Sequence, residues 1–124
     1  MVTVRFNDQP ESIASIEDFG IALDRFDRSP KFEIWLSVEG GPSICMLRNG
    51  KHAWLMYLRF EGDSGFVSQA ELSAQGVASY ELANGQIDEY PLAWCIDVEQ
   101  CYKALAFFFV NEGAQPDWVS WHAS

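Results

Sequence analysis

Apolar residues recur at every second position in several segments of this chain, which is the pattern of a β-strand that buries one face. The clearest example is residues 31–38, where Phe32, Ile34 and Leu36 share a face. The first segment, 1–6, is expected to be an edge strand that the Pro10 region ends. Further short strands are predicted at 66–68, 77–82, 86–90 and, as a last strand or an extended tail, 117–121.

Residues 43–60 predict a nearly complete β-hairpin. Asn49-Gly50 lies between two apolar runs, and such a pair is a strong hairpin signal because the central residues of a tight turn must accept a positive φ. The register that follows places Cys45 opposite Trp54. Since both faces of this hairpin are apolar, we expect it at the centre of the sheet, with both faces covered.

A second hairpin is predicted around Asn84-Gly85. Its register places Glu81 directly opposite Asp88, and two carboxylates in such positions repel at a cost of about 0.2–1 kcal/mol. The pair is therefore a candidate for meeting a cationic partner. Two alternatives remain open: both carboxylates face solvent, or a basic residue of a neighbouring strand neutralises them, from the set Arg48, Lys51 and Arg59.

Two amphipathic helices complete the pattern. Ser15 and Asp18 have the spacing of a capping box, and an apolar stripe follows them. Asp97 and Gln100 begin the second helix in the same way, and Gly113 is placed to end it. Because the second helix is apolar nearly all round, we expect it to lie against the sheet on a broad front.

Length and composition fit one globular domain over residues 1–124, of which 48% are hydrophobic. We expect an α+β fold, with a mostly antiparallel sheet of about five to seven strands built on the two Asn-Gly hairpins and two helices packed on it.

The first twenty residues are too charged for a secretory segment, and no apolar run approaches the ~20 residues of a membrane span. A cytoplasmic protein is expected, with its three cysteines as free thiols.

Negative charge is concentrated in the second half of the chain. Residues 1–60 hold eight acidic and seven basic side chains, whereas residues 61–124 hold ten acidic side chains against Lys103. Such a surface repels nucleic acid and attracts a basic protein, so direct DNA or RNA binding is not expected. Acidity that serves only solubility is the alternative.

Catalytic motifs are weak in this chain. Residues 62–65 spell Gly-Asp-Ser-Gly, as around a serine-protease nucleophile, but neither His52 nor His122 is placed as its base, so Ser64 is expected in a turn. The histidines and cysteines match no metal-ligand spacing, and we expect neither metal nor cofactor. A Cys45–His52 nucleophile pair stays open but indicates no particular reaction. No enzyme class is predicted.

Three segments carry a resemblance to a known family: CMLRNGKHAWLMYLRF at 45–60, NGQIDEYP at 84–91 and NEGAQPDWVSWH at 111–122. Together they resemble immunity protein family one of bacterial polymorphic toxin systems. More narrowly, the chain is similar to immunity proteins encoded beside double-stranded-DNA cytosine deaminase toxins, over about residues 31–122. The resemblance implies a non-enzymatic cytoplasmic domain that binds one cognate toxin in a 1:1 complex and occludes its active site or its nucleic-acid channel.

The partner-binding face is predicted to combine carboxylates with aromatic anchors. A deaminase that grips DNA carries a basic cleft, which an acidic protein can occupy in place of the nucleic acid. The tryptophans are assigned instead to core packing. An acidic adaptor or chaperone-like module without toxin specificity is the alternative function. The predicted face consists of Glu61, Asp63, Phe66, Tyr80, Glu81, Asp88, Glu89 and Tyr90.

Overall fold

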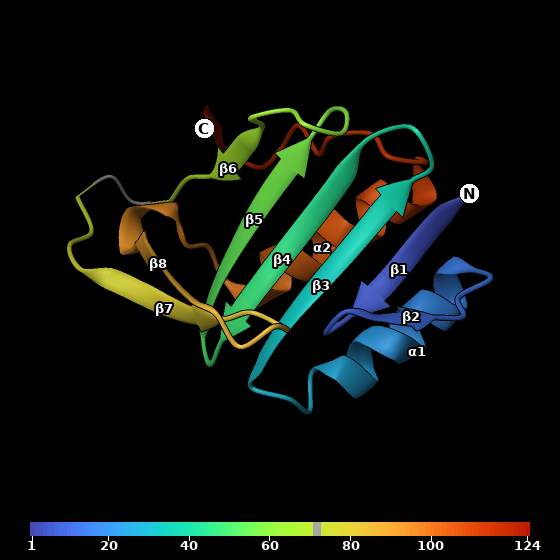
Figure 1. Cartoon of the computed structure of the whole chain (residues 1–124), viewed down its shortest axis with the longest axis horizontal. Coiled ribbons are helices and arrows are strands. Elements are labelled where there is room, and N and C mark those ends of the chain that lie inside the picture. The colour runs from blue at the N-terminus through green and yellow to red at the C-terminus, as the bar shows by residue number, and fades with distance from the viewer. Residues whose placement is uncertain (71–72) are drawn as a thin grey trace.

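The computed structural model describes residues 1–70 and 73–124 and confirms the α+β fold (Figure 1). Two α-helices, one 3₁₀ turn and nine strands make up this described part. The strands are β1 (Val2–Phe6), β2 (Gln9–Glu11), β3 (Lys31–Val38), β4 (Ser43–Asn49), β5 (His52–Leu58), β6 (Phe66–Ser68), β7 (Val77–Glu81), β8 (Ile87–Pro91) and β9 (Trp121–Ala123). The helices are α1 (Ile16–Phe26), α2 (Val98–Val110) and the 3₁₀ turn η1 (Leu92–Trp94).

Seven strands form one sheet in the order β2-β1-β3-β4-β5-β6-β9, and every pairing between described strands is antiparallel. The predicted central hairpin, β4 and β5, is confirmed in the middle of this sheet. Both helices lie on one face, which we call the inner face, and the β7–β8 hairpin lies across the other, the outer face (Figure 1). The second hairpin forms a separate two-stranded sheet. Because the helices lie on one face of the central hairpin and this small sheet lies on the other, both faces are covered in part.

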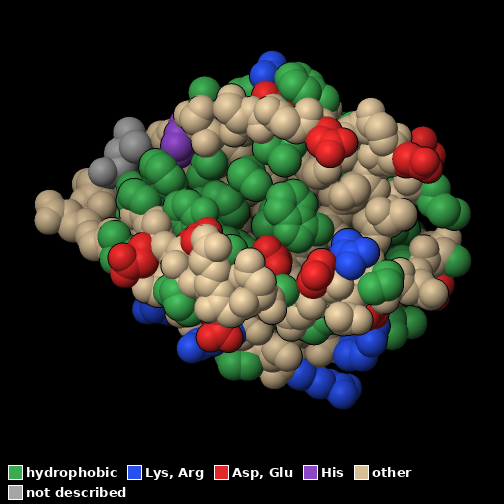
Figure 2. All heavy atoms as spheres, in the orientation of Figure 1, with side chains coloured by type: hydrophobic (Ala, Val, Ile, Leu, Met, Phe, Trp, Pro, Cys, Tyr) green, Lys and Arg blue, Asp and Glu red, His purple; other side chains and the backbone are tan. Residues whose placement is uncertain are grey.

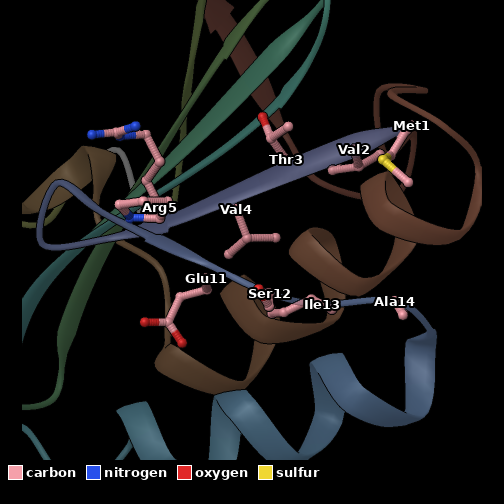
Figure 3. A pocket seen from close by; sticks show the side chains of 10 residues that line it. Met1, Val2, Thr3, Val4, Arg5, Glu11, Ser12, Ile13 and Ala14 are labelled. Atoms are coloured by element: carbon pink, nitrogen blue, oxygen red, sulfur yellow. The ribbon is translucent and has the colours of Figure 1, made fainter.

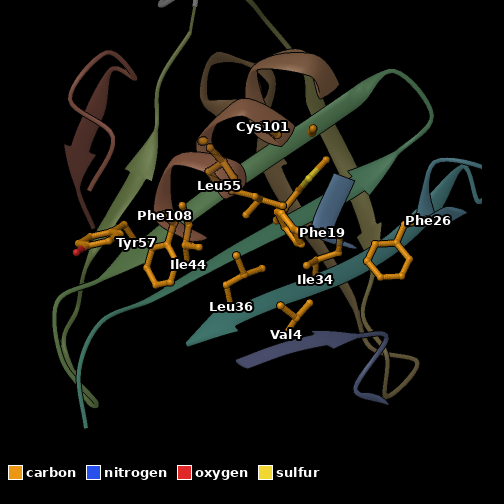
Figure 4. Packing of buried hydrophobic residues seen from close by; sticks show 14 of the residues in the cluster. Val4, Phe19, Phe26, Ile34, Leu36, Ile44, Leu55, Tyr57, Cys101 and Phe108 are labelled. Carbon is orange, nitrogen blue, oxygen red and sulfur yellow. The ribbon is translucent and has the colours of Figure 1, made fainter. Parts of the chain in front are cut away.

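The main core lies between the inner face and the helices (Figure 4). Alternation along β3 turns Ile34 and Leu36 toward the helices, and both side chains are fully buried. From α2, Phe108 enters the same core and meets the ring of Tyr57 edge to face, with the ring centroids 6.2 Å apart. Phe19 of α1 stacks on a phenylalanine of α2, which joins the two helices. The broad apolar surface predicted for the second helix is therefore buried where expected.

Both predicted helix starts are confirmed by their capping bonds. The Ser15 hydroxyl accepts the Asp18 N–H at 3.1 Å, and the Asp97 carboxylate accepts the Gln100 N–H at 2.8 Å. At the end of α2, Gly113 has a φ of +98°, and a Cβ there would lie 2.6 Å from the side chain of Pro42. The chain needs glycine at this position for both reasons.

The register of the central hairpin differs from the predicted one. Asn49 pairs with His52, so the two-residue loop is Gly50-Lys51, with Gly50 at φ +61°. A turn with glycine at its first central position leaves Asn49 in the strand. Each residue of β4 therefore pairs with a residue of β5 two positions further along the chain than predicted, for example Cys45 with Met56. Because the shift is even, every side chain stays on its predicted face.

The predicted pairing of Glu81 with Asp88 is wrong. The loop of the second hairpin has three residues, because Leu82 donates its N–H to the Gln86 carbonyl at 2.8 Å and Gly85 takes a φ of +89°. Glu81 pairs with Ile87 instead, and Asp88 lies on the opposite face of the hairpin. The expected carboxylate repulsion across the strands is therefore absent.

The edges of the large sheet also differ from expectation. Residues 9–11 form β2 outside β1, so β1 is not the edge strand. Pro10 is tolerated there because an edge strand needs no N–H on its solvent side. At the opposite edge, the last strand begins only at Trp121 and pairs with β6, so residues 117–120 of the predicted segment are not part of a strand.

Replacing Ser68 with alanine is expected to destabilise the fold by about 1–3 kcal/mol. The fully buried Ser68 hydroxyl accepts the Leu55 N–H at 3.0 Å and donates to the Trp94 carbonyl at 2.7 Å, so alanine leaves both buried groups unpaired. Urea unfolding of both proteins measures the loss, with exposed Ser64→Ala as a control that should change stability by less than about 0.5 kcal/mol. Equal stability of Ser68→Ala and wild type would contradict this role.

Candidate functional site

The β7–β8 hairpin is held on the outer face by contacts to three strands. Tyr90 stacks on Trp54 of β5, with ring centroids 4.4 Å apart. Asn49 of β4 donates its side-chain N–H to the Ser79 carbonyl at 2.7 Å. At the hairpin tip, the Ala83 N–H donates to a carboxylate of β3 at 3.2 Å. These contacts fix the five predicted site residues that lie on the hairpin.

Tyr80 does not belong to the exposed face predicted for it. It faces the sheet with 1% of its surface exposed, and its hydroxyl lies 3.0 Å from the sulfur of Cys95. Burial, followed by the contact with Cys95, raises the pKa of the Tyr80 hydroxyl. Tyr80 is a packing residue, because the period of two along β7 turns it inward with Ala78.

Asp88 and Tyr90 are half-buried on the inward side of the hairpin. The Tyr90 hydroxyl donates to the Asp88 carboxylate at 3.1 Å, and the Gln86 amide donates to its other oxygen at 2.7 Å. Burial, with a contribution from the neighbouring carboxylate, raises the pKa of Tyr90 to about 12. The ring and the carboxylate are therefore fixed relative to each other before any partner arrives.

The outward side of the hairpin carries Glu81 and Glu89 together with Val77 and Ile87. All four are exposed, the two aliphatic side chains by 57% and 56%. The ion pairs within residues 1–70 and 73–124 involve neither glutamate. Neutralisation by Arg48 or Arg59 is not realised, because those guanidinium groups pair with other carboxylates. Two glutamates therefore remain on the surface for a cationic partner.

The remaining predicted residues form a separate group around the β5–β6 loop. Glu61 is exposed, but Phe66 turns to the inner face and packs against the main core. Asp63 keeps only 3% of its side chain exposed, because Arg59 binds it. This loop begins after Leu58, about 13 Å along β5 from the position of Trp54 beneath the hairpin. The eight predicted residues therefore do not form one continuous face.

Asp63 is expected to make stability pH-dependent. Two nitrogens of the Arg59 side chain, each 2.9 Å from a carboxylate oxygen, and then the Arg59 N–H hold the pKa of Asp63 well below its usual range. A lowered folded-state pKa stabilises the fold above the unfolded value of about 3.9, and this contribution disappears as pH falls through the folded-state pKa.

Asp63→Asn should therefore melt below wild type at neutral pH, and the difference in Tm should shrink from about pH 4 downward. Calorimetry across this range measures the difference, with Glu61→Gln in the same exposed loop as the control. A gap in Tm that stays constant down to the lowest pH would refute the ionic role.

An uncovered apolar surface lies on the outer face beside the hairpin. Trp35, Cys45 and Met56 are directly aligned across β3, β4 and β5. Trp94 follows the hairpin, and its ring centroid lies 6.0 Å from that of Tyr90. We call the half-exposed side chains Trp35, Met56, Tyr90 and Trp94 the outer apolar patch. Figure 2 shows hydrophobic side chains gathered over β4 and β5 with acidic side chains beside them.

Three members of this patch were missing from the predicted face, because the tryptophans were assigned to packing and Met56 was not singled out. A usable signal existed for Trp35, which alternates with the buried residues of β3 and therefore had to face the other side. No comparable signal existed for Trp94, since its position depends on the path of the chain after the hairpin.

Other candidate chemistry is not assembled in the structure. Cys45 pairs with Met56, four residues along β5 from His52, so the thiol and the imidazole are about 13 Å apart along the strand. Burial raises the pKa of the Cys45 thiol, which keeps it protonated. Within the described residues, no three His, Cys, Asp or Glu side chains group as a metal site. No helix of the described part has the length and apolar character to cross a membrane.

A cavity of about 530 Å³ lies at the far edge of the sheet, between β1 and residues 10–14 (Figure 3). Its charged side chains are already paired: Arg5 with Asp8 at 3.2 Å, and Glu11 with Arg25 at 2.7 Å. The cavity therefore offers mainly backbone and aliphatic surface.

Comparison with models of known protein families finds none that matches this chain, and comparison with curated proteins finds no match either.

Proposed function

We propose that this chain is an immunity protein that binds and neutralises one bacterial toxin in the cytoplasm. The toxin is a DNA cytosine deaminase, in keeping with the resemblance of residues 31–122 to immunity proteins of such toxins. The protein acts by covering the active site or the DNA-binding cleft of the toxin with its acidic outer side, in a 1:1 complex. It carries out no reaction of its own and binds neither nucleic acid nor membrane.

The observation that carries the proposal is the outward side of the β7–β8 hairpin. Glu81 and Glu89 are exposed there without an ion pair in the described part of the chain, and the exposed aliphatic side chains Val77 and Ile87 lie on the same side. A surface that carries both acidic and apolar side chains suits a partner with a cleft for nucleic acid. Basic side chains in such a cleft bind the phosphates, and its apolar side chains stack on the bases. The charge balance of residues 61–124 steers such a partner toward this side.

The decisive experiment titrates this protein into a deamination assay of double-stranded DNA with the toxin domain encoded beside it. Complete inhibition at one equivalent, with nanomolar or tighter affinity, is the expected result. An adaptor would instead bind several basic proteins weakly and leave the deaminase active. Full activity at a large excess of this protein would refute the proposed function.

A further inference from the structure

The β8 strand has a free hydrogen-bonding edge. Leu82 donates to the Gln86 carbonyl at 2.8 Å, and Leu92 donates to the Gly76 carbonyl at 3.0 Å, which fixes the hydrogen-bonded positions at both ends of the hairpin. Hydrogen-bonded and non-hydrogen-bonded pairs alternate along antiparallel strands, so the N–H and C=O groups of Ile87 and Glu89 point away from β7. No described residue bonds these groups.

This edge faces the outer apolar patch. The β7 strand lies above Asn49, which binds the Ser79 carbonyl, and β8 lies above Trp54, which stacks on Tyr90. The next position along β5 on the same face is Met56, about 6.7 Å further on. A third strand added to β8, at the usual spacing of about 4.8 Å, would therefore lie above the patch.

The width of the patch matches a short segment. Trp35 and Met56 lie two strands apart, which is about 10 Å and corresponds to about three extended residues. Trp94 lies at one end of the patch, where its ring packs against Tyr90 and His122. Ile87 and Glu89 together offer hydrogen bonds to a segment of the same length.

The side chains of β8 specify the chemistry of that segment. A residue opposite Glu89 would point outward beside a carboxylate, where a lysine or arginine is favoured. A residue opposite Asp88 would point toward the sheet and onto the outer apolar patch, where an aliphatic side chain is favoured because Gln86 and Tyr90 already bind the Asp88 carboxylate. A residue opposite Ile87 would point outward and lie diagonal to Glu89, within reach of a long basic side chain, so the pattern required of the partner is basic, apolar, basic.

We propose that an extended basic–apolar–basic segment of the partner protein adds to β8 as a third strand above the outer apolar patch. This inference rests on the proposed function, because the toxin is the partner that would supply the segment. Main-chain bonds to Ile87 and Glu89 supply affinity, while the patch and the carboxylates select the sequence.

The test uses isotope-labelled protein and the capped peptide Lys-Val-Lys-Val-Lys, with Glu-Val-Glu-Val-Glu as the charge-reversed control. The basic peptide should shift the amide resonances of Ile87 and Glu89 and slow their hydrogen exchange. The acidic peptide should bind about tenfold more weakly. Changes confined to other parts of the protein, equal binding of both peptides, or no binding would overturn the proposal.

Variants separate edge pairing from simple contact. Ile87→Pro removes one outward N–H and no bond within the hairpin, and Pro91 already occupies an equivalent position. The affinity for the basic peptide should fall about tenfold in this variant. Ile87→Thr keeps the N–H and should bind within twofold of wild type. Met56→Gln keeps the size of the patch residue but makes it polar, and should also weaken binding without altering the hairpin.

The results that would refute this proposal differ from those that would refute the proposed function. If the toxin is inhibited by wild type and Ile87→Pro alike and the peptide does not bind, the edge proposal falls and the immunity function stands. If the peptide binds at β8 but the toxin stays active, the edge stands and the toxin assignment falls. If Ile87→Pro changes self-association in sedimentation without affecting peptide binding, the edge belongs to a second copy and the proposal is overturned.

Discussion

Replacing Phe108 with alanine is expected to destabilise the protein by about 3–5 kcal/mol, the largest loss of stability predicted for a single site. Phe108 is fully buried at the centre of the interface between α2 and the sheet, where it meets the ring of Tyr57 (Figure 4). Alanine removes the apolar surface and leaves a cavity that the rigid central strands cannot close. Single domains are stable by only about 5–15 kcal/mol, so this variant approaches the limit of folding.

Thermal and urea unfolding measure this effect, and Tm should fall by about 10–20 °C. Val110→Ala on the same helix is the matched control, because its side chain is 58% exposed and should contribute less than about 0.5 kcal/mol. Equal losses in the two variants would show that helix propensity, instead of core packing, holds α2 in place. A loss below about 1 kcal/mol at Phe108 would contradict the described core.

The elements of this fold could be predicted from the sequence because their signals are local. The capping residues Ser15 and Asp97 begin helices by bonds made within one turn, and alternation along residues 31–38 needs only the period of a strand. Registers are harder to predict, since one Asn-Gly pair is compatible with several loop lengths. Gly50 takes the first position of a two-residue loop, whereas Gly85 closes a three-residue loop.

Which residues share a face in the candidate site depends on those registers and on the tertiary arrangement of the strands. A one-residue shift in the second hairpin moved Asp88 to the inward side and brought Glu89 to the outward side with Glu81. Phe66 could not be assigned to a face until β6 was known to join the inner side of the sheet. Trp35 joins a surface only because the hairpin stops short of it, which depends on contacts between segments distant in sequence.

Reversing the charge of Glu81 and Glu89 to lysine is expected to weaken toxin binding by about 10- to 100-fold. Both side chains are exposed on the outward side of the hairpin without an ion pair in the described part, so lysines there break no ion pair and remove only the exposed 3.3 Å hydrogen bond from the Ser79 hydroxyl to Glu89. They repel a basic cleft at short range and reduce its long-range attraction. Inhibition of deamination would then require a correspondingly higher concentration of this protein.

A matched control separates the hairpin from the total charge. Glu17→Lys with Asp24→Lys makes the same change in net charge on α1, which lies on the opposite side of the sheet (Figure 1). Because exposed charges separated by more than about 10 Å are largely screened at 0.1 M salt, the control should lose affinity only slightly under those conditions. Equal losses in both variants would leave only a general effect of net charge, and no loss in either would place the toxin on another surface. A loss specific to the hairpin variant that grows as salt is lowered would identify these two glutamates as the groups that meet the basic cleft.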